Sequence, residues 1–336
     1  MMKYVFLTAC RNEEATLDEF VTEFSSMVAS AGIAGRTVLY VVDDLSTDRT
    51  REILDRRAQE PNGTSLRTIR APTNFGNQGA MFYGLGRIEL DADDVLVTFD
   101  SDGEDDVREI QSILKLGAEN PGKMVLIERG RRSESLKFKF FFAGYKTLFR
   151  LLTRQRVVPN NFMLIPGAFV PVIAHSPLAA VHLAYGILKL GAPSVIVTRD
   201  RRPRYGGRSS QNLFMLVSHG MVGLMVFYEV VIAKLFLLLF DFAAFATSLV
   251  GVAALLPESS VVAQRTLNGI AIAASVGAAG FLSLLLSAAL ALVLKLAAFT
   301  LSQAYGERQA ALRPRVANAS SEPHDARDER GGTASH

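Results

Sequence analysis

The chain has 336 residues, of which 49% are hydrophobic and 21% are charged, and its formal net charge is +3. This balance excludes intrinsic disorder for most of the chain, and so small a net charge does not indicate a nucleic-acid partner. Charged residues lie almost entirely before Arg208 or after Tyr305, and the apolar stretch between them excludes a wholly soluble protein. The single cysteine, Cys10, cannot form an internal disulfide, which fits a reducing compartment.

Short apolar or β-branched runs alternate with helical patterns over the first 208 residues. The predicted strands are residues 3–8, 37–42, 66–69, 95–99, 123–127 and 194–198. The predicted helices are residues 14–31, 49–58, 76–88, 107–116 and 138–152. This alternation is typical of an α/β fold with a mainly parallel sheet and flanking helices. Such sheets bind ligands outside the carboxyl ends of their strands.

The remainder of the chain predicts a membrane region. We interpret residues 209–234 as an amphipathic helix region that lies in the membrane interface. Residues 235–256 and 270–294 each exceed the roughly 20 apolar residues that a helix needs to cross a bilayer. Residues 235–300 are therefore expected to hold two transmembrane helices. The tail, residues 301–336, is rich in Ala, Arg, Ser, Glu and Asp and is expected to be disordered.

Arginines flank the apolar region on both sides. They are Arg199, Arg201, Arg202, Arg204 and Arg208 before it, and Arg308, Arg313 and Arg315 after it. By the positive-inside rule both ends are cytoplasmic, which predicts a multi-pass protein of the inner (cytoplasmic) membrane with residues 1–208 in the cytoplasm. Asp241 either lies near the cytoplasmic surface of the first span or makes a polar contact with a lipid. Small residues at 277–280 allow a homo-oligomer through close helix packing.

Two acidic motifs follow predicted strands. Asp43 and Asp44 end the second strand, where paired carboxylates can accept hydrogen bonds from a base and from ribose hydroxyls; the alternative is a turn that only caps the next helix. Asp100 and Asp102 follow the fourth strand and point the same way because they are two residues apart. Hard oxygen ligands at this spacing suit Mg²⁺ or Mn²⁺ bound together with a nucleotide diphosphate. The alternative is a solvated acidic loop.

Several other site signatures do not occur in the sequence. No G-x-G-x-x-G follows the first predicted strand, and no G-x-x-x-x-G-K-[ST] is present, so a dinucleotide-binding dehydrogenase and a P-loop NTPase are poorly supported. The five histidines are dispersed, which argues against a zinc site.

The order of the motifs carries more information than any one of them. T-A-C-R-N-E-E follows the first strand, V-D-D-x-S-x-D-x-T follows the second, N-F-G-N-Q-G-A-M-x-x-G covers residues 74–84, and D-S-D-G-E follows the fourth strand. This arrangement resembles the family-2 glycosyltransferases with a GT-A fold. The two C-terminal spans make it similar to the polyprenyl-phosphate glycosyltransferases, the group of dolichol-phosphate mannose synthases and bacterial undecaprenyl-phosphate sugar transferases.

The resemblance implies roles for the matching residues. It implies donor contacts at Thr8, Asn12, Glu13, Asp43, Asp44, Gly76 and Asp100. It implies a Mg²⁺ or Mn²⁺ cofactor held by Asp100, Asp102 and Glu104. It implies catalytic roles for Asp102, Glu104, Arg132 and Arg204, and substrate contacts at Arg129, Lys137 and Ser209. The basic residues would bind phosphates by charge-assisted hydrogen bonds, with anchoring to lipid headgroups as the alternative.

Two positions depart from the family pattern. Residues 158–164 lack the carboxylate that relatives carry before their acceptor region, and Ser210 stands where a lysine often follows the loop serine. A phosphate acceptor is already anionic near neutral pH, so its attack on the anomeric carbon does not require a strong base. The resemblance thus implies one displacement with inversion, in which the metal stabilises the departing diphosphate and the arginines position the acceptor.

Two alternatives remain beside a polyprenyl-phosphate acceptor. One is transfer to a different lipid, and the other is a catalytically inactive membrane scaffold that binds a nucleotide sugar. A polysaccharide synthase is disfavoured because its Q-x-x-R-W motif needs a tryptophan, and the chain has none.

Overall fold

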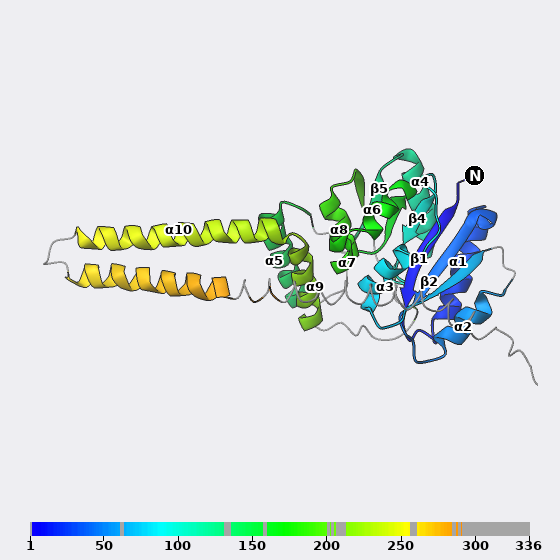
Figure 1. Cartoon of the computed structure of the whole chain (residues 1–336), viewed down its shortest axis with the longest axis horizontal. Coiled ribbons are helices and arrows are strands. Elements are labelled where there is room, and N and C mark those ends of the chain that lie inside the picture. Colours follow the sequence, from blue (N-terminus) through cyan, green and yellow to red (C-terminus); the bar gives the residue numbers. More distant parts are fainter. Residues whose placement is uncertain are drawn as a thin grey trace, which may run out of the picture. The chain divides into compact units, whose positions relative to one another are not determined.

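The computed structural model describes residues 2–60, 64–130, 136–156, 160–199, 202, 205, 213–255, 261–283, 287 and 290. All of them lie in one compact unit, Met1–Val293. The centre of this unit is a seven-stranded sheet in the order β3-β2-β1-β4-β6-β5-β7. Figure 1 labels β1, β2, β4 and β5 of this sheet. The strands are β1 (Tyr4–Cys10), β2 (Thr37–Asp43), β3 (Ser65–Arg70), β4 (Val95–Thr98), β5 (Met124–Arg129), β6 (Met163–Pro166) and β7 (Ser194–Arg199).

One described strand runs against the others. β6 is antiparallel to both of its neighbours, β4 and β5, whereas the remaining pairs are parallel. The mainly parallel sheet is therefore confirmed, but the sequence did not predict β6. Because β6 is antiparallel, its first residue, Met163, pairs with Thr98 at the end of β4. The start of β6 consequently lies at the edge where the parallel strands end.

The predicted helices form, within a few residues of their expected bounds. The helices are α1 (Leu17–Ser30), α2 (Thr50–Arg57), α3 (Gly76–Leu85), α4 (Ile110–Glu119), α5 (Leu136–Thr153), α6 (Val170–Ala174), α7 (Pro177–Val181), α8 (Leu183–Leu190), α9 (Leu213–Val226) and α10 (Tyr228–Ala254). Three short 3-10 turns occupy Ala34–Arg36, Val107–Glu109 and Gly167–Phe169. The sequence did not predict α6, α7 and α8, which follow β6.

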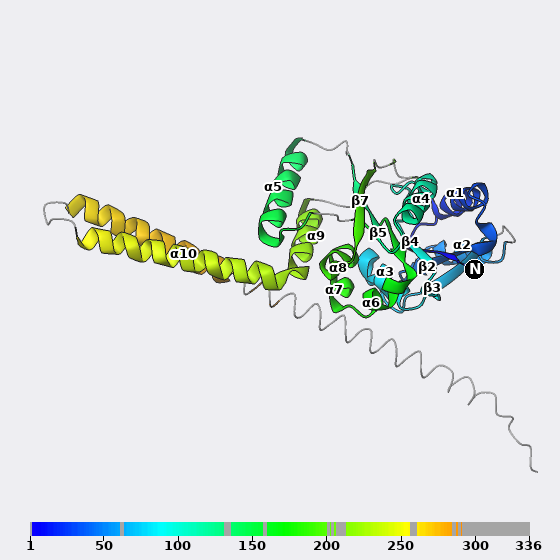
Figure 2. The same cartoon turned by 90° about the horizontal axis from the view of Figure 1, so that it is seen from above.

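Neighbouring residues of β1 bury opposite faces of the sheet, as the twofold period of a strand requires. The ring of Phe6 packs edge-on against Phe24 of α1, with 4.9 Å between centroids. Leu7 faces α3, where Gly84 approaches so closely that an added Cβ would lie 2.8 Å from Leu7 Cδ1. Figure 2 shows α1 and α4 on one side of the sheet and α3 on the other. Helices thus cover both faces.

Two described helices are long and apolar enough to cross a membrane. They are Tyr228–Val252, which is most of α10, and Val261–Ser283. Most of their side chains are exposed, including Leu237 and Phe240, as expected for helices whose solvent is lipid. Both helices begin earlier than the predicted spans at 235 and 270. α9 ends just before α10, so the predicted interfacial region 209–234 contains α9 and the first turns of α10.

Cys10 ends β1 and belongs to the hydrophobic core, with 3% of its surface exposed. Burial, followed by the nearby carboxylates of Glu13 and Asp43, raises the pKa of its thiol well above the ordinary value. We therefore expect N-ethylmaleimide at about pH 8 to leave the folded protein unlabelled. The same reagent should label it fully in guanidinium chloride, as measured by intact mass. Rapid labelling of the native protein would contradict this burial.

Candidate functional site

Four chain segments bring polar residues to one edge of the sheet. In the parallel register, Cys10 at the end of β1 pairs with Asp43 at the end of β2. β4 pairs with β1 on the other side, and Asp100 follows β4 directly. The start of β6 reaches the same edge because that strand is antiparallel. The predicted donor residues that lie at this edge are Asn12, Glu13, Asp43, Asp44 and Asp100.

Asp44 is a buried carboxylate that organises the start of α3. Its oxygens accept hydrogen bonds from the backbone N–H groups of Phe75 and Gly76, at 2.7 and 2.8 Å. Burial raises the pKa of Asp44, and these two hydrogen bonds oppose the rise. Gly76 has a φ of 70°, in the left-handed region that favours glycine. Asp44 thus holds Gly76, another predicted substrate contact, at the sheet edge.

Asp43 is fully buried and closes the turn that follows β2. One of its oxygens accepts a hydrogen bond from Ser46 N at 2.9 Å, and the other lies 3.3 Å from Arg51 Nε. Leu45, between them in sequence, has a φ of 59°. These contacts match the turn-forming alternative for Asp43, and its contact with a nucleotide stays a prediction.

The loop after β1 is tied to the loops after β2 and β4. Asn12 N donates to Ser46 Oγ at 3.1 Å, and Asn12 Oδ1 accepts from Thr47 N at 2.8 Å. Glu13 Oε2 accepts from Ser101 Oγ at 2.7 Å, between the two acidic residues of the D-S-D-G-E motif. Hydrogen bonds therefore hold three loops that are far apart in sequence next to one another at the predicted site.

Two buried polar side chains near this edge have atoms without a hydrogen-bond partner among the described residues. They are the Thr8 hydroxyl and both amide atoms of Asn160. Each unsatisfied group costs about 1–3 kcal/mol, and such departures from good core design concentrate at functional sites. Thr8 is fully buried within β1, so its side chain does not reach the surface of the site.

A chain of side-chain amides surrounds Asp100. Asp100 Oδ1 accepts hydrogen bonds from Asn77 Nδ2 at 3.0 Å and from Asn161 Nδ2 at 2.9 Å. Asn161 Oδ1 accepts from Gln78 Nε2 at 2.7 Å, and Gln78 Oε1 accepts from the backbone N–H of Leu183 at 3.1 Å. This network joins β4 to α3, β6 and α8, and it fixes the orientation of the Asp100 carboxylate.

Sequence reasoning did not assign these amides to the site. Asn77 and Gln78 stand inside the quoted N-F-G-N-Q-G motif, which was the signal available. Asn161 was noted only as a missing carboxylate, because without a predicted β6 nothing indicated that it reaches Asp100. An antiparallel strand between parallel ones is what places it there.

The acidic loop after β4 turns sharply at Gly103, whose φ is 83°. Across this turn, Asp102 Oδ1 accepts a hydrogen bond from Glu104 N at 3.0 Å. The backbone oxygens of Asp102 and Glu104 accept from the N–H groups of Tyr205 and Arg202, both at 3.2 Å. The acidic loop is therefore bound by the segment that follows β7, which the resemblance associates with the acceptor.

The donor set suits a divalent cation only in combination with a substrate. Among the described residues, no three His, Cys, Asp or Glu side chains gather into a metal-binding group. Asp100 Oδ1 is engaged by amides, and Asp102 Oδ1 turns back to its own loop. Mg²⁺ is typically held by one or two carboxylates together with substrate phosphates. One or two of the half-buried carboxylates of Asp100, Asp102 and Glu104 would meet that shared mode, but the three together do not form the predicted metal-binding group.

The structure does not describe the side chains of the basic residues that were predicted for the site, nor that of Ser209. Arg132, Arg204 and Ser209 lie outside the described residues. Arg129 lies in β5 and Lys137 in α5, and only their backbones are described. Roles for these five residues stay predictions.

The chain was compared with known proteins. Residues 6–170 match the family model described as "Glycosyl transferase family 2". This match contains the donor motifs described above. Among curated proteins, no sequence matches the chain.

Solved structures with low sequence identity also align with the chain. Glucosyl-3-phosphoglycerate synthase from Mycobacterium tuberculosis aligns at 17% identity and a TM-score of 0.47, over 68% of this chain and 80% of that one. Mannosyl-3-phosphoglycerate synthase from Rubrobacter xylanophilus aligns at 15% and 0.45, over 67% and 72%. S. aureus TarS 1-349 aligns at 15% and 0.41, over 80% and 69%. The M. tuberculosis enzyme has also been solved with Mn²⁺ and UDP-glucose.

Asn161→Asp tests the amide network through pH. The new carboxylate would face Asp100 across a contact that is now 2.9 Å, so the pair shares a proton and one pKa rises above its unfolded value. The variant's stability should approach that of the wild type near pH 4.5 and fall behind it by about 1–3 kcal/mol at pH 8, as the raised pKa is passed.

The measurement is thermal unfolding of both proteins in EDTA, compared at each pH. Gln59→Glu is the control, because it also turns an amide into a carboxylate, at an exposed position just after α2. A deficit of Asn161→Asp that is the same at both pH values would show that the two side chains do not interact.

Proposed function

Because residues 6–170 match the model of glycosyl transferase family 2, we propose that the chain is a membrane-bound inverting glycosyltransferase of this family. The donor is a nucleotide-diphosphate sugar and the acceptor is a polyprenyl phosphate. The observation that carries the proposal is the convergence of Asn12, Glu13, Asp44 and the acidic loop at one edge of a GT-A-type mixed α/β sheet, beside a chain segment that ends in two candidate membrane spans.

The donor half of the reaction is assigned to this edge. The buried loops around Asp43 and Asp44 form the nucleotide side, and the half-buried Asp100, Asp102 and Glu104 face the diphosphate. A divalent cation, Mg²⁺ or Mn²⁺, would be held there by one or two of these carboxylates together with the substrate, and it would stabilise charge on the departing diphosphate. The amides of Asn77 and Asn161 keep Asp100 oriented, so little rearrangement is needed when the donor binds.

Contacts between the domain and α10 support a lipid acceptor. Phe227, directly before α10, packs edge-on against Phe149 of α5 at 5.5 Å between centroids. In the first turns of α10, Glu229 pairs with Lys189 at 2.9 Å, and Lys234 donates to the Leu151 carbonyl at 2.5 Å. These contacts tether the first candidate span to the catalytic domain, so a lipid whose phosphate lies at the membrane surface is kept close to the donor.

The chemistry beside Asp100 favours a phosphate acceptor over a hydroxyl. A hydroxyl must lose a proton as it attacks, and a general base is needed within hydrogen-bond reach. Asn161 lies two residues before β6. Its side chain is an amide that donates a hydrogen bond to Asp100, and an amide cannot act as a general base. A phosphate oxygen attacks without such a base. Arg132 and Arg204 are proposed to hold it in line with the anomeric carbon, which gives inversion in a single displacement.

The proposed location is the inner (cytoplasmic) membrane, with the catalytic domain in the cytoplasm, where nucleotide sugars are available. Support comes from the arginines on both sides of the apolar region. Transfer to a different lipid, or binding of a nucleotide sugar without transfer, are the alternatives that the next two experiments separate.

Asp100→Ala should reduce metal-dependent sugar transfer by about 10²–10³-fold, because it removes a carboxylate that faces the leaving group. The assay uses purified full-length protein, Mn²⁺, radiolabelled UDP-glucose or GDP-mannose, and polyprenyl phosphate, followed by lipid extraction. Asp93→Ala is the control, since Asp93 is an exposed acid outside the site. Full activity of the Asp100 variant would reject the role of Asp100. If the wild type showed neither sugar transfer nor donor hydrolysis, the assignment as a glycosyltransferase would be rejected.

The acceptor is tested by comparing a polyprenyl phosphate with the corresponding polyprenol in the same assay. We expect labelled lipid only with the phosphate, at least about 100-fold above the alcohol, because the missing base would leave the hydroxyl protonated. Equal labelling of the two lipids would reject the phosphate acceptor while leaving the glycosyltransferase assignment intact.

A further inference from the structure

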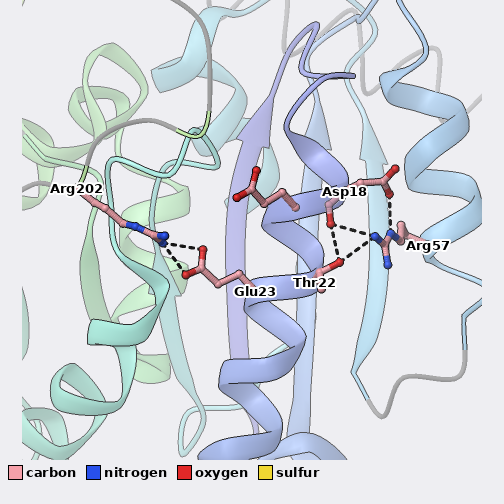
Figure 3. Close-up of a pocket in the computed structure, with 6 residues that line it drawn as sticks. Asp18, Thr22, Glu23, Arg57 and Arg202 are labelled. Carbon is pink, nitrogen blue, oxygen red and sulfur yellow. Dashed lines mark hydrogen bonds and ion pairs between the residues drawn. The ribbon is translucent and has the colours of Figure 1, made fainter.

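Glu23 on α1 holds two residues of the arginine-rich segment that follows β7. Its two carboxylate oxygens lie 2.6 and 2.8 Å from Arg202 Nη1, as Figure 3 shows. The same carboxylate accepts a hydrogen bond from the Tyr205 hydroxyl. The Glu23 and Arg202 side chains are only 21% and 31% exposed, so water screens their attraction less than that of a surface pair. We call these three residues the Glu23 clasp.

The residues held by Glu23 also bind the acidic loop through their backbones. Arg202 N donates to the Glu104 carbonyl, and Tyr205 N donates to the Asp102 carbonyl, both at 3.2 Å. The clasp therefore connects α1 to the two residues that flank the Gly103 turn.

The Tyr205 ring fixes the shape of the turn. A Cβ added to Gly103 would lie 2.5 Å from the ring, so the ring presses directly on the glycine backbone. The Arg202 guanidinium lies 5.6 Å from the centroid of the same ring, within range of a cation–π attraction. Tyr205 also packs on the main hydrophobic core. The Tyr205 ring thus packs against one side of the turn at Gly103, whose φ is 83°.

Other charged and titratable groups lie close to Glu23. Arg108 Nε lies 3.7 Å from Glu23 and pairs with Asp106 at 2.7 Å through another nitrogen. Burial, and then the hydrogen bond to Glu23, raise the pKa of Tyr205 above its ordinary value. The phenol therefore stays protonated and donates to Glu23 throughout the neutral pH range.

We propose that Glu23 is a positioning residue for glycosyl transfer. It holds the backbone of Arg202 and Tyr205 against the Asp102–Glu104 loop, and so sets the carboxylates that receive the metal-bound diphosphate. The inference rests on the proposed function. Without the clasp, the acidic loop keeps two backbone hydrogen bonds to a segment that has lost its contacts with α1.

The surroundings of Glu23 make a clean test possible. A surface pocket of about 450 Å³ lies beside it, lined by Asp18, Glu19, Thr22, Glu23, Arg57 and Arg202 (Figure 3). Because glutamine has nearly the same size and shape as glutamate, Glu23→Gln leaves no cavity and should unfold at nearly the wild-type temperature. Glu19→Gln is the matched control: it removes one carboxylate from the same helix and the same pocket, one turn away.

The first measurement is calorimetric binding of UDP and of GDP to the full-length protein, with and without Mn²⁺. For whichever nucleotide binds, Glu23→Gln should weaken the Mn²⁺-dependent affinity about tenfold, the scale of a charge-assisted hydrogen bond. Metal-free binding should not change. Tyr205→Phe, which keeps the ring and the Arg202 pair, should give a smaller loss. A variant that is merely less stable would weaken both kinds of binding together.

The second measurement does not depend on any nucleotide. Limited trypsin digestion should cut the bond between Arg204 and Tyr205 about tenfold faster in Glu23→Gln than in wild type, because cleavage follows the population in which the segment is released. Fragments are identified by mass. Glu19→Gln should cut at the wild-type rate.

The outcomes separate this inference from the proposed function. Faster cleavage together with a selective loss of Mn²⁺-dependent binding supports the clasp. Cleavage and binding equal to those of Glu19→Gln overturn it, even if the wild type transfers sugar. If neither nucleotide binds the wild type, the donor assignment and with it the positioning role are overturned, and the digestion still reports whether Glu23 anchors the segment.

Discussion

The structure depends on how it satisfies carboxylates at the carboxyl edge of a mainly parallel sheet. Asp43 and Asp44 are almost fully buried, and burying a charge without partners costs several kcal/mol. Each carboxylate accepts hydrogen bonds from a neighbouring segment. Asp43 accepts them from Ser46 and Arg51, and Asp44 accepts them from the N–H groups at the start of α3. The electrostatic requirement of the acids therefore shapes the donor site, and the loops have little freedom to rearrange.

Hydrogen bonds of polar side chains also link the loops to one another. Ser101 joins the acidic loop to Glu13, and Asn12 joins the first loop to the second. Each bond alone is worth about 1 kcal/mol. Together they couple segments that are more than thirty residues apart, so the polar groups of the candidate site are positioned by the strands and by each other.

The sequence predicted those features that depend on local patterns of residues, and it missed those that depend on contacts between distant parts of the chain. Strands such as β1 and β2 read clearly because long β-branched runs are bounded by polar motifs. β6 did not, because Met163–Pro166 is too short for periodicity to separate a strand from a buried helix, and its antiparallel direction is a tertiary property. Asn161 was consequently overlooked. The Glu23 contacts were also beyond reach, because Glu23 and Arg202 are 179 residues apart and no local pattern pairs them.

The boundary of the first span shows how tertiary contacts refine a hydropathy argument. α10 begins at Tyr228, and on that basis Asp241 would lie near the middle of a membrane helix, where a carboxylate is costly. Glu229 and Lys234, however, are engaged with Lys189 and with the end of α5. Those turns therefore belong with the domain, and the apolar stretch proper starts at Leu235. Asp241 then lies about two turns beyond Leu235, and its place near the membrane surface stays a prediction.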